Sequence, residues 1–518
     1  MAVRAGVDIP NTGHFWGHPK GVFLVTIVEM WERFSYYGMM GLLVLFLTAA
    51  PVDDGFGWDR AAAIKLYGMY SGLVFVSPAI GGWLSSYYLG ERKCILIGGL
   101  SVALGHLFLA GPAYFPELVD MLAAAPVEQM LNTSDPVYGR FSLSEPEWSS
   151  IRQKISVVGE FAARQDELAF WIKLSYTLKS WSFIVGLALI VAGTGFIKAT
   201  VSSIVGKLYA ENDSRRDTGF TIFMVGIWIG SFLSSFIAGT LGEKMGWHWG
   251  LGIAGVAMAV GISIYLIWHN RILGNVGCRP DRRLVPADSD RTSRLNNIEV
   301  CRLFAMLTMS AFTIIYAVAF YQKGGLIHLM IQQSVDRTVG SFEIPATWFL
   351  AISTGGFIIL APLVARGVDR LSAGGITIDV VQKQATGLAA MAVAYVFLFK
   401  AAQDVQMGGS SVSMWWFVCA YVFFAIGDIF VWPPQISVVG RYAPPRLKSF
   451  YIGAWYVTVG LGTYVSGYVG AFGYEVGVPQ LFRALLLVSA ASSVALILLR
   501  PKLQRLLDGP MGDRSLTL

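Results

Sequence analysis

The chain has 518 residues, of which 55% are hydrophobic and 14% are charged, and its mean hydropathy is +0.57. Soluble domains carry about 25% charged residues, so this composition argues against a soluble protein and predicts a polytopic membrane protein. The net charge of +6 indicates no nucleic-acid partner, because no soluble basic domain is present to carry that role.

Twelve segments are long and apolar enough to cross a bilayer, which requires about 20 apolar residues per helix. We therefore predict an all-α membrane protein with twelve transmembrane helices in two six-helix bundles. The first segment holds three charges and is too long for a signal-peptide core, so we expect no cleavable signal. The twelve segments are approximately residues 21–48, 62–86, 94–114, 178–199, 218–241, 249–269, 300–331, 345–366, 379–401, 413–437, 449–472 and 480–499.

Lysine and arginine gather in alternate loops and at the end of the chain. The positive-inside rule places these segments, and with them both termini, in the cytoplasm. We expect a multi-pass protein of a bacterial inner membrane, since no organelle-targeting signal appears. The basic segments are residues 90–93, 212–217, 279–284, 365–371, 440–448 and 500–505.

The polar stretch 270–298 divides the chain into two halves of six helices, as in transporters built from two related bundles. A second long connection, about 115–177, lies outside, and a partly helical surface excursion is its preferred interpretation. The expected domains are an N-terminal bundle 1–269, a cytoplasmic linker 270–298, a C-terminal bundle 299–500 and a cytoplasmic tail 501–518.

The first helix carries charges near its middle, in the sequence VEMWERFSYYG. Each such charge costs about 2.5–3.5 kcal/mol in a bilayer. An internal ion pair would explain one carboxylate, whereas the second leaves a titratable group, which is typical of a proton-coupled site. Spacings of three or four residues bring the following side chains near one stripe of the helix: Glu29, Glu32, Arg33, Tyr36 and Tyr37.

The fourth helix carries a second unusual charge, Lys198, beside Gly193 and Gly195, which allow another helix to approach closely. A carboxylate partner from another helix is expected, and the first-helix glutamates are the obvious candidates. The alternative is that Lys198 reaches the inner membrane surface. Cysteine spacing predicts neither a disulfide framework nor a metal site, and no cofactor is expected.

These stretches resemble the proton-dependent oligopeptide transporter family, a branch of the major facilitator superfamily. The first-helix pattern E-x-x-E-R-F-x-Y-Y-G is complete at residues 29–38. The fourth-helix pattern G-T-G-x-x-K-P, continuing to G-K-L-Y, is present except that Ala199 replaces the proline. Segments 342–349, 359–365 and 453–467 also resemble the family, so the resemblance covers nearly the whole chain.

The resemblance implies a symporter of the major facilitator type that imports di- and tripeptides with protons by alternating access. Glu29 and Glu32 would then handle protons, with Arg33 and Lys198 as partners of those carboxylates or of the substrate carboxylate. Arginine suits that role because its planar fork binds a carboxylate bidentately. The expected partners are protons, a peptide or peptide-like solute and the lipid bilayer, and the expected oligomeric state is a monomer.

Several positions depart from the family pattern and bear on the substrate. The tenth helix has Asp428 where the family has a glutamate thought to hold the peptide amino terminus. The loop after the second helix has Ser86 and Tyr87 where the superfamily has an acidic-basic pair. The whole substrate-binding set that we expect is Arg33, Tyr36, Tyr37, Lys198, Trp228, Tyr321, Lys323, Ser353, Asp428 and Trp432.

Three of these positions allow two interpretations. Trp228 and Trp432 either narrow the cavity, favouring a smaller or more apolar substrate, or are helix-packing residues. Lys323 either favours a substrate with extra acidic character or pairs with Asp428. His106 and His328 are interpreted as packing or hydrogen-bonded residues.

Three further functions remain as alternatives. The same fold could carry another solute, such as a modified amino acid, a peptide-like metabolite or an organic anion. An enzyme is disfavoured, because the sequence has no nucleophile elbow, zinc-ligand spacing or phosphate loop. A non-transporting receptor is disfavoured too, because it would have no need of the intramembrane charges.

Overall fold

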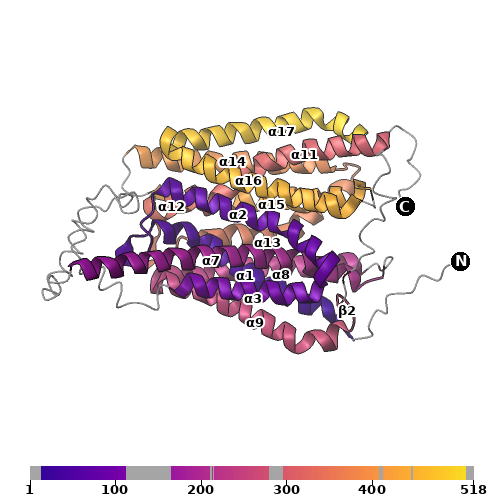
Figure 1. Ribbon diagram of the computed structural model, residues 1–518. Coiled ribbons are helices and arrows are strands. Elements are labelled where there is room, and N and C mark those ends of the chain that lie inside the picture. The colour runs from indigo at the N-terminus through magenta and orange to yellow at the C-terminus, as the bar shows by residue number, and fades with distance from the viewer. Residues whose placement is uncertain are drawn as a thin grey trace.

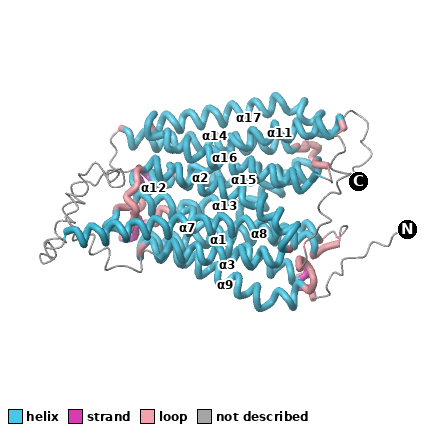
Figure 2. Tube along the Cα trace, in the orientation of Figure 1, coloured by secondary structure: helices cyan, strands magenta, loops and turns pink. Residues whose placement is uncertain are grey.

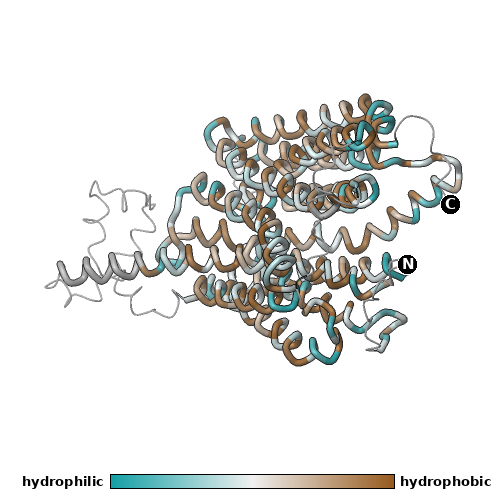
Figure 3. Tube along the Cα trace, turned by 45° about the vertical axis from the view of Figure 1, so that its right-hand side comes forward, coloured by the Kyte–Doolittle hydropathy of each residue, from teal (hydrophilic) through white to brown (hydrophobic). Residues whose placement is uncertain are grey.

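The computed structural model describes residues 13–111, 165–210, 213, 215–278, 280, 296–407, 412–444 and 447–508. Its long helices run side by side between two ends of the molecule (Figure 1, Figure 2). We call the end at which α1 begins the proximal end, and the end at which α1 finishes the distal end. Hydrophilic residues gather at these two ends, and apolar residues line the helices between them (Figure 3).

The first half of the chain forms one group of packed helices, in which α1 packs against α8 and α9 while α3 packs against α7. A two-stranded hairpin precedes α1. The elements are β1 (His14–Phe15), β2 (His18–Pro19), α1 (Lys20–Thr48), the 3₁₀ turn η1 (Pro51–Asp53), α2 (Arg60–Leu84), the π-helical turn η2 (Ser85–Leu89), α3 (Glu91–Ala110), α7 (Gln165–Lys207), α8 (Arg216–Met245) and α9 (Trp247–Leu273).

The second half forms another group, in which α14 packs against α15 and α17. Short strands lie at its distal end, where β4 pairs with β5 and β3 pairs with β6. The elements are α11 (Asn297–Phe320), the 3₁₀ turn η6 (Tyr321–Gly324), α12 (Leu326–Ser334), β3 (Val335–Asp336), β4 (Thr338–Val339), β5 (Phe342–Glu343), α13 (Trp348–Ala373), α14 (Val380–Gln406), β6 (Val412–Ser413), α15 (Trp415–Tyr442), α16 (Lys448–Val476) and α17 (Val478–Asp508).

Each expected membrane span lies mainly on residues that the structure shows as helical. Ten helices of the described residues are long and apolar enough to cross a membrane. The other two expected spans correspond to α1 and α16, which have 29 residues each and pack among the ten. The fold is therefore the predicted all-α membrane architecture. Most of the 115–177 excursion and of the 270–298 linker lies outside the described residues, although residues 165–177 continue α7 as a helix.

The seventh expected span, 300–331, lies within one candidate membrane span, Asn297–Ser334, but its α-helix is interrupted. It breaks between α11 and α12 at η6, and Gly325 adopts φ −117° and ψ −105°. Gly324 lies so close to the Tyr67 hydroxyl of α2 that a Cβ atom there would be 2.4 Å from it. Lys323 lies in this interruption and is buried.

The two groups of helices meet along two seams, α2 with α16 and α8 with α13. On the first seam glycines allow backbone contact, since a Cβ on Gly68 would lie 2.6 Å from the Cα of Gly467. On the second seam Phe236 packs against Trp348, with ring centroids 4.8 Å apart. These contacts lie between the distal end and the middle of the molecule.

The proximal half of α13 is not covered in the same way. None of its residues from 361 to 373 is buried, whereas Phe349, Leu350 and Ala351 in its distal half are. Its half-buried residues there, Ala361, Val364 and Val368, lie on one stripe of the helix, so this half of α13 is packed on one side and exposed on the others. The two bundles therefore close on each other at the distal end and diverge at the proximal end.

Candidate functional site

A cluster of three charged side chains lies in the middle of α1. Glu29, Glu32 and Arg33 are at most 3% exposed. The Arg33 Nε atom lies 3.3 Å from Glu29 Oε1 and donates a hydrogen bond of 2.5 Å to Glu32 Oε2. Glu29 Oε2 and Glu32 Oε1 have no hydrogen-bond partner among the described residues. The predicted internal ion pair therefore exists, and it leaves one oxygen of each carboxylate free for a proton or a ligand.

Aromatic rings cover this cluster on the distal side. The Tyr36 ring centroid lies 5.1 Å from Arg33 Cζ, a cation–π distance. The Tyr36 and Tyr37 rings are 5.0 Å apart, and the Tyr36 and Phe75 rings are 6.3 Å apart. Both tyrosines thus lie beside the charges, as the helical spacing predicts.

Lys198 of α7 points between the two bundles. Its Nζ atom lies 4.0 Å from the Phe75 ring centroid on α2 and 5.4 Å from that of Tyr456 on α16. Within the described residues no carboxylate forms an ion pair with it, so the expected direct pair is absent from this conformation. The charges of Arg33, Glu32 and Glu29 still act on the ammonium. The alternative in which Lys198 reaches the membrane surface does not fit this position.

The second bundle presents Asp428 of α15, which has no exposed surface. Its Oδ1 atom accepts hydrogen bonds from the Tyr316 hydroxyl at 3.0 Å and from Trp432 Nε1 at 2.7 Å. Its Oδ2 atom has no hydrogen-bond partner in the described part of the chain. Trp432 is therefore part of the charged site.

Lys323 of η6 lies on the same side of the second bundle and is 2% exposed. Its Nζ atom donates to Ser353 Oγ at 3.3 Å and lies 3.6 Å from the Phe320 ring centroid. Asp428 acts on it electrostatically, but no ion pair joins the two side chains among the described residues. The predicted alternative of a direct Lys323–Asp428 pair is thus not formed here.

A chain of rings connects the two charged clusters. Phe75 contacts Tyr321 at a centroid distance of 5.7 Å, and Tyr321 contacts Phe320 at 5.3 Å. Phe320 in turn lies 5.8 Å from Trp432. The predicted residues of α1, α7, η6 and α15 therefore surround one region between the bundles.

Trp228 is the member of the predicted set that lies apart from the charges. It stacks on Phe357 across the α8–α13 seam, with centroids 4.0 Å apart and an interplanar angle of 19°. Its packing interpretation is the better one. His106 is buried and its Nε2 atom lies 2.5 Å from Ser35 Oγ, in agreement with its prediction, and His328 is fully buried.

A network of side chains closes the distal end, and we call it the distal latch: Glu243, Lys244, Arg337 and Glu343 with the first residues before α13, Ala346 and Thr347. The Glu243 carboxylate accepts hydrogen bonds from the Ala346 and Thr347 amides at 2.8 and 2.9 Å. The Thr347 hydroxyl donates to it as well, at 2.8 Å. Glu243 of the first bundle thus caps a helix of the second, where the helix dipole favours negative charge.

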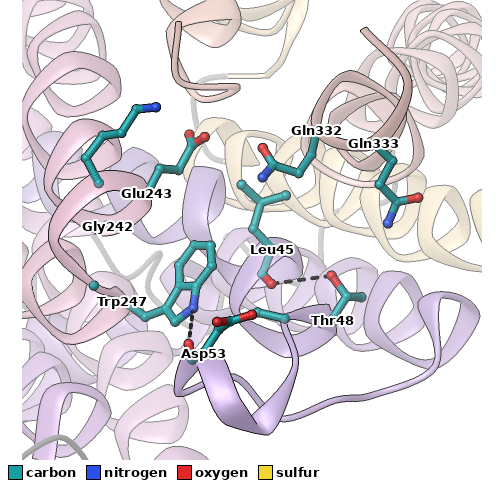
Figure 4. Close-up of a pocket in the computed structure, with 11 residues that line it drawn as sticks. Leu45, Thr48, Asp53, Gly242, Glu243, Trp247, Gln332 and Gln333 are labelled. Atoms are coloured by element: carbon teal, nitrogen blue, oxygen red, sulfur yellow. Dashed lines mark hydrogen bonds between the residues drawn. The ribbon is translucent and has the colours of Figure 1, made fainter. Parts of the chain in front are cut away.

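Ion pairs complete the latch. Arg337 lies 3.6 Å from Glu243 and 2.6 Å from Glu343, and Lys244 lies 3.2 Å from Glu343. The Lys244 hydrogen bond and the Arg337 charge lower the pKa of Glu343 below its ordinary value. A pocket of about 410 Å³ opens beside the latch (Figure 4). Trp247 lines it and donates from Nε1 to the Asp53 carbonyl at 2.9 Å.

The proximal loops carry a separate set of contacts. Arg92 donates to the Gly274 carbonyl at 2.6 Å and to the Val276 carbonyl at 2.7 Å, and so caps the end of α9. Glu91 pairs with Lys207 at 2.8 Å. These contacts lie within the first bundle, at the start of α3, next to the turn η2 in which Ser86 and Tyr87 depart from the superfamily pattern.

Residues 92–273 and 290–479 match the model of the POT family. The chain belongs to the POT family. Peptide transporter YePEPT of Yersinia enterocolitica is 26% identical over 99% of this chain and 100% of that protein. The expectation of a transporter rather than an enzyme is confirmed by the family and by this relative.

Solved structures confirm the fold of this POT-family chain. Peptide transporter POT in complex with sulfate matches with a TM-score of 0.77 at 23% identity, over 96% of this chain and 98% of that chain. A POT family transporter in complex with 5-aminolevulinic acid matches with a TM-score of 0.75 at 19% identity, over 95% and 98%.

The sequence analysis missed three aromatic members of the site. Tyr316 and Phe320 lie one helical turn apart on α11, next to Lys323, so helical spacing from Lys323 was a usable signal. Phe75 touches Tyr36, Tyr321 and Lys198 but stands among other apolar residues of α2, where a single sequence gives no sign of its position.

Proposed function

We propose that this POT-family protein imports di- and tripeptides together with protons by alternating access. The observation that carries the proposal is the buried Glu29–Glu32–Arg33 cluster on α1, in which each carboxylate has one oxygen without a hydrogen-bond partner among the described residues. Intramembrane ionisable groups in such a position mark proton and substrate pathways. YePEPT is named a peptide transporter, which supports the choice of cargo.

The proposed cycle depends on competition for positive partners. Protonation of a first-helix carboxylate weakens its hold on Arg33, which then binds the substrate carboxylate together with Lys198. The bundles, 1–269 and 299–500, rock about the site, and proton loss restores the ion pair and releases the substrate. One pH unit contributes about 1.36 kcal/mol per proton, and 100 mV contributes about 2.3 kcal/mol per net charge.

The conformation fits the release step of that cycle. With the proximal end in the cytoplasm, as the loop charges predict, the closed distal latch faces outside and the bundles diverge toward the inside. We propose a monomer in a bacterial inner membrane with both termini cytoplasmic. The remaining members of the proposed substrate site are Tyr36, Tyr37, Tyr321, Lys323, Ser353, Asp428 and Trp432, whereas Trp228 is left out because it packs on Phe357.

The test is uptake of labelled dialanine by proteoliposomes under an imposed pH gradient. Accumulation above the equilibrium level, abolished by a protonophore, is the expected result. A second candidate is proton-coupled transport of another small solute, which the relative bound to 5-aminolevulinic acid favours. Gradient-driven uptake of 5-aminolevulinic acid without uptake of dialanine would replace the first proposal by the second.

A further inference from the structure

The pocket of about 410 Å³ at the distal end is built by both bundles (Figure 4). The first bundle supplies Asp53 of η1, the end of α8 and the start of α9, which includes Trp247. The second bundle supplies Gln332 and Gln333 of α12. Figure 4 shows Gln332 on the side of the pocket opposite Glu243. The pocket therefore exists as one cavity only while the distal ends of the two bundles are together.

The lining of the pocket carries one charge that no ion pair neutralises in the described part of the chain. Glu243 and Lys244 line the pocket, and both take part in the ion pairs of the distal latch. Asp53 accepts a hydrogen bond from Trp247 Nε1 through its backbone carbonyl, and its carboxylate has no partner among the described residues. The lining thus has a net negative charge, which is available to a cation.

Two further features of the lining favour an organic cation. Gln332 Oε1 is buried without a hydrogen-bond partner among the described residues, so it can accept from an N–H group. The Trp247 ring lines the pocket, and aromatic faces attract cations. Within the described residues no three His, Cys, Asp or Glu side chains are grouped as a metal site would need, so a metal ion fits the pocket less well.

We propose that this distal pocket binds a small organic cation of the amidinium or guanidinium class, and that the bound cation holds the distal end closed. Such a cation is planar and carries several N–H donors, so it can donate to a carboxylate and to an amide oxygen at once. Asp53 supplies the charge from the first bundle, and Gln332 supplies the acceptor from the second. The pocket does not include the central charges Arg33 and Asp428, so this inference goes beyond the proposed function.

Binding at this place has a consequence for transport. A ligand that contacts both bundles binds the distally closed state more tightly than the distally open state, because opening separates the two walls of its site. It therefore shifts the equilibrium toward the closed state by that difference in affinity. A transporter that is held closed distally cannot accept substrate from the distal side. We expect such a cation to lower the maximum rate of peptide uptake rather than to compete with the peptide.

The experiment compares benzamidine, a planar amidinium cation, with benzamide, a neutral molecule of nearly the same shape. Thermal unfolding of the detergent-solubilised protein measures binding whether or not the protein transports peptides, so this test is separate from that of the proposed function. We expect benzamidine to stabilise the protein at concentrations about tenfold lower than benzamide, because only the cation makes a charge-assisted hydrogen bond. Equal stabilisation by the two molecules would overturn the proposal.

Uptake kinetics test the effect of the bound cation on the distal end. In proteoliposomes that accumulate dialanine, external benzamidine should lower the maximum rate and leave the KM for dialanine nearly unchanged. A raised KM with an unchanged maximum rate would overturn the proposal, because the cation would then compete with the peptide at the central site.

Variants of the two walls test whether the cation bridges the bundles. The benzamidine concentration for half-maximal stabilisation should rise about tenfold in Asp53→Asn and about fivefold in Gln332→Leu, since each change removes one contact. The matched controls are Asp404→Asn and Gln403→Leu at the end of α14, which do not line the pocket and should respond as the wild type does. Asp53 is exposed, so its replacement leaves the core intact even if Gln332→Leu does not fold. A wild-type response of Asp53→Asn would place the cation elsewhere and refute the site.

Discussion

Glu29 and Glu32 both interact with Arg33, and this shared partner determines the role of each carboxylate in proton coupling. We expect Glu32→Gln to abolish proton-driven accumulation while retaining counterflow exchange, because glutamine mimics the protonated acid but cannot lose the proton. Accumulation and counterflow in the same proteoliposomes measure both properties. Glu475→Gln, at the exposed distal end of α16, is the control. Accumulation against a gradient by Glu32→Gln would remove this carboxylate from proton coupling.

Lys198 differs from these residues because rings rather than carboxylates surround it. Removing one partner of a buried ion pair costs about 3–5 kcal/mol, but Lys198 forms no such pair within the described part of the chain. We therefore expect Lys198→Ala to lose transport while it inserts normally and unfolds within a few degrees of the wild type. Uptake and thermal unfolding in detergent measure the two effects. Wild-type uptake would exclude Lys198 from the mechanism, and a large loss of stability would indicate a structural role.

The residues of α1 and α7 differ in how far the sequence predicted them. Glu29, Glu32 and Arg33 lie within four residues, so helix geometry alone brings them together. The partners of Lys198 come from α2 and α16, and α16 belongs to the other bundle. Its contact with Tyr456 depends on how the two bundles are placed, which no local pattern encodes.

At the level of elements, the latch joins α8 to the start of α13. We expect Glu243→Ala to raise the population of the distally open state, because three hydrogen bonds to Glu243 and its pairing with Arg337 are lost. Electron–electron distance measurement between spin labels at Asp59 and Gln480, with the native cysteines replaced, reports this opening. Glu475→Ala is the control. An unchanged distance distribution would show that the latch does not hold the distal end.

The charge of Glu343 in the distal latch also bears on how uptake depends on pH. Because the pKa of Glu343 is lowered in the closed state, its contribution is complete above its ordinary pKa and is lost only as the pH falls through the lowered value. Between about pH 5 and 8 its charge is therefore constant. We expect Glu343→Gln to change the amount of uptake but not the midpoint of the pH profile. A shifted midpoint would place a coupled proton on the latch.

Hydropathy could not predict the 3₁₀ turn η6, which interrupts the helix between α11 and α12. Residues 300–331 form one apolar run, and the sequence GG at 324–325 signals weakened helix but no particular turn. At that turn Gly324 lies against Tyr67 of α2, so closely that a Cβ there would be 2.4 Å from the Tyr67 hydroxyl. That turn carries Lys323 to its position beside Ser353 and Phe320.

At the scale of the whole molecule, composition and the length of the apolar runs were enough to predict the class, an all-α membrane protein, because bilayer thickness fixes helix length. The arrangement of the seams was not predictable in the same way. Closure of the distal end relies on glycines that face each other across α2 and α16. The chain has 57 glycines, and the local sequence does not distinguish these from the others. The conformation, closed distally and open proximally, is a property of the seams rather than of any helix.

This dependence on the α2–α16 seam leads to a test of alternating access. A methyl group on Gly68 would lie 2.6 Å from the Cα of Gly467, so Gly68→Ala must push the helices apart. Gly453, near the proximal end of α16, has no atom within 4 Å of such a methyl group and is the matched control. Both changes raise helix propensity by about the same 1 kcal/mol. A difference between the two variants therefore reports the contact between α2 and α16 at Gly68. We expect peptide uptake and distal closure, followed by the same spin-label pair, to fall in Gly68→Ala and to remain in Gly453→Ala. Equal behaviour of the two variants would mean that transport does not require this seam to close.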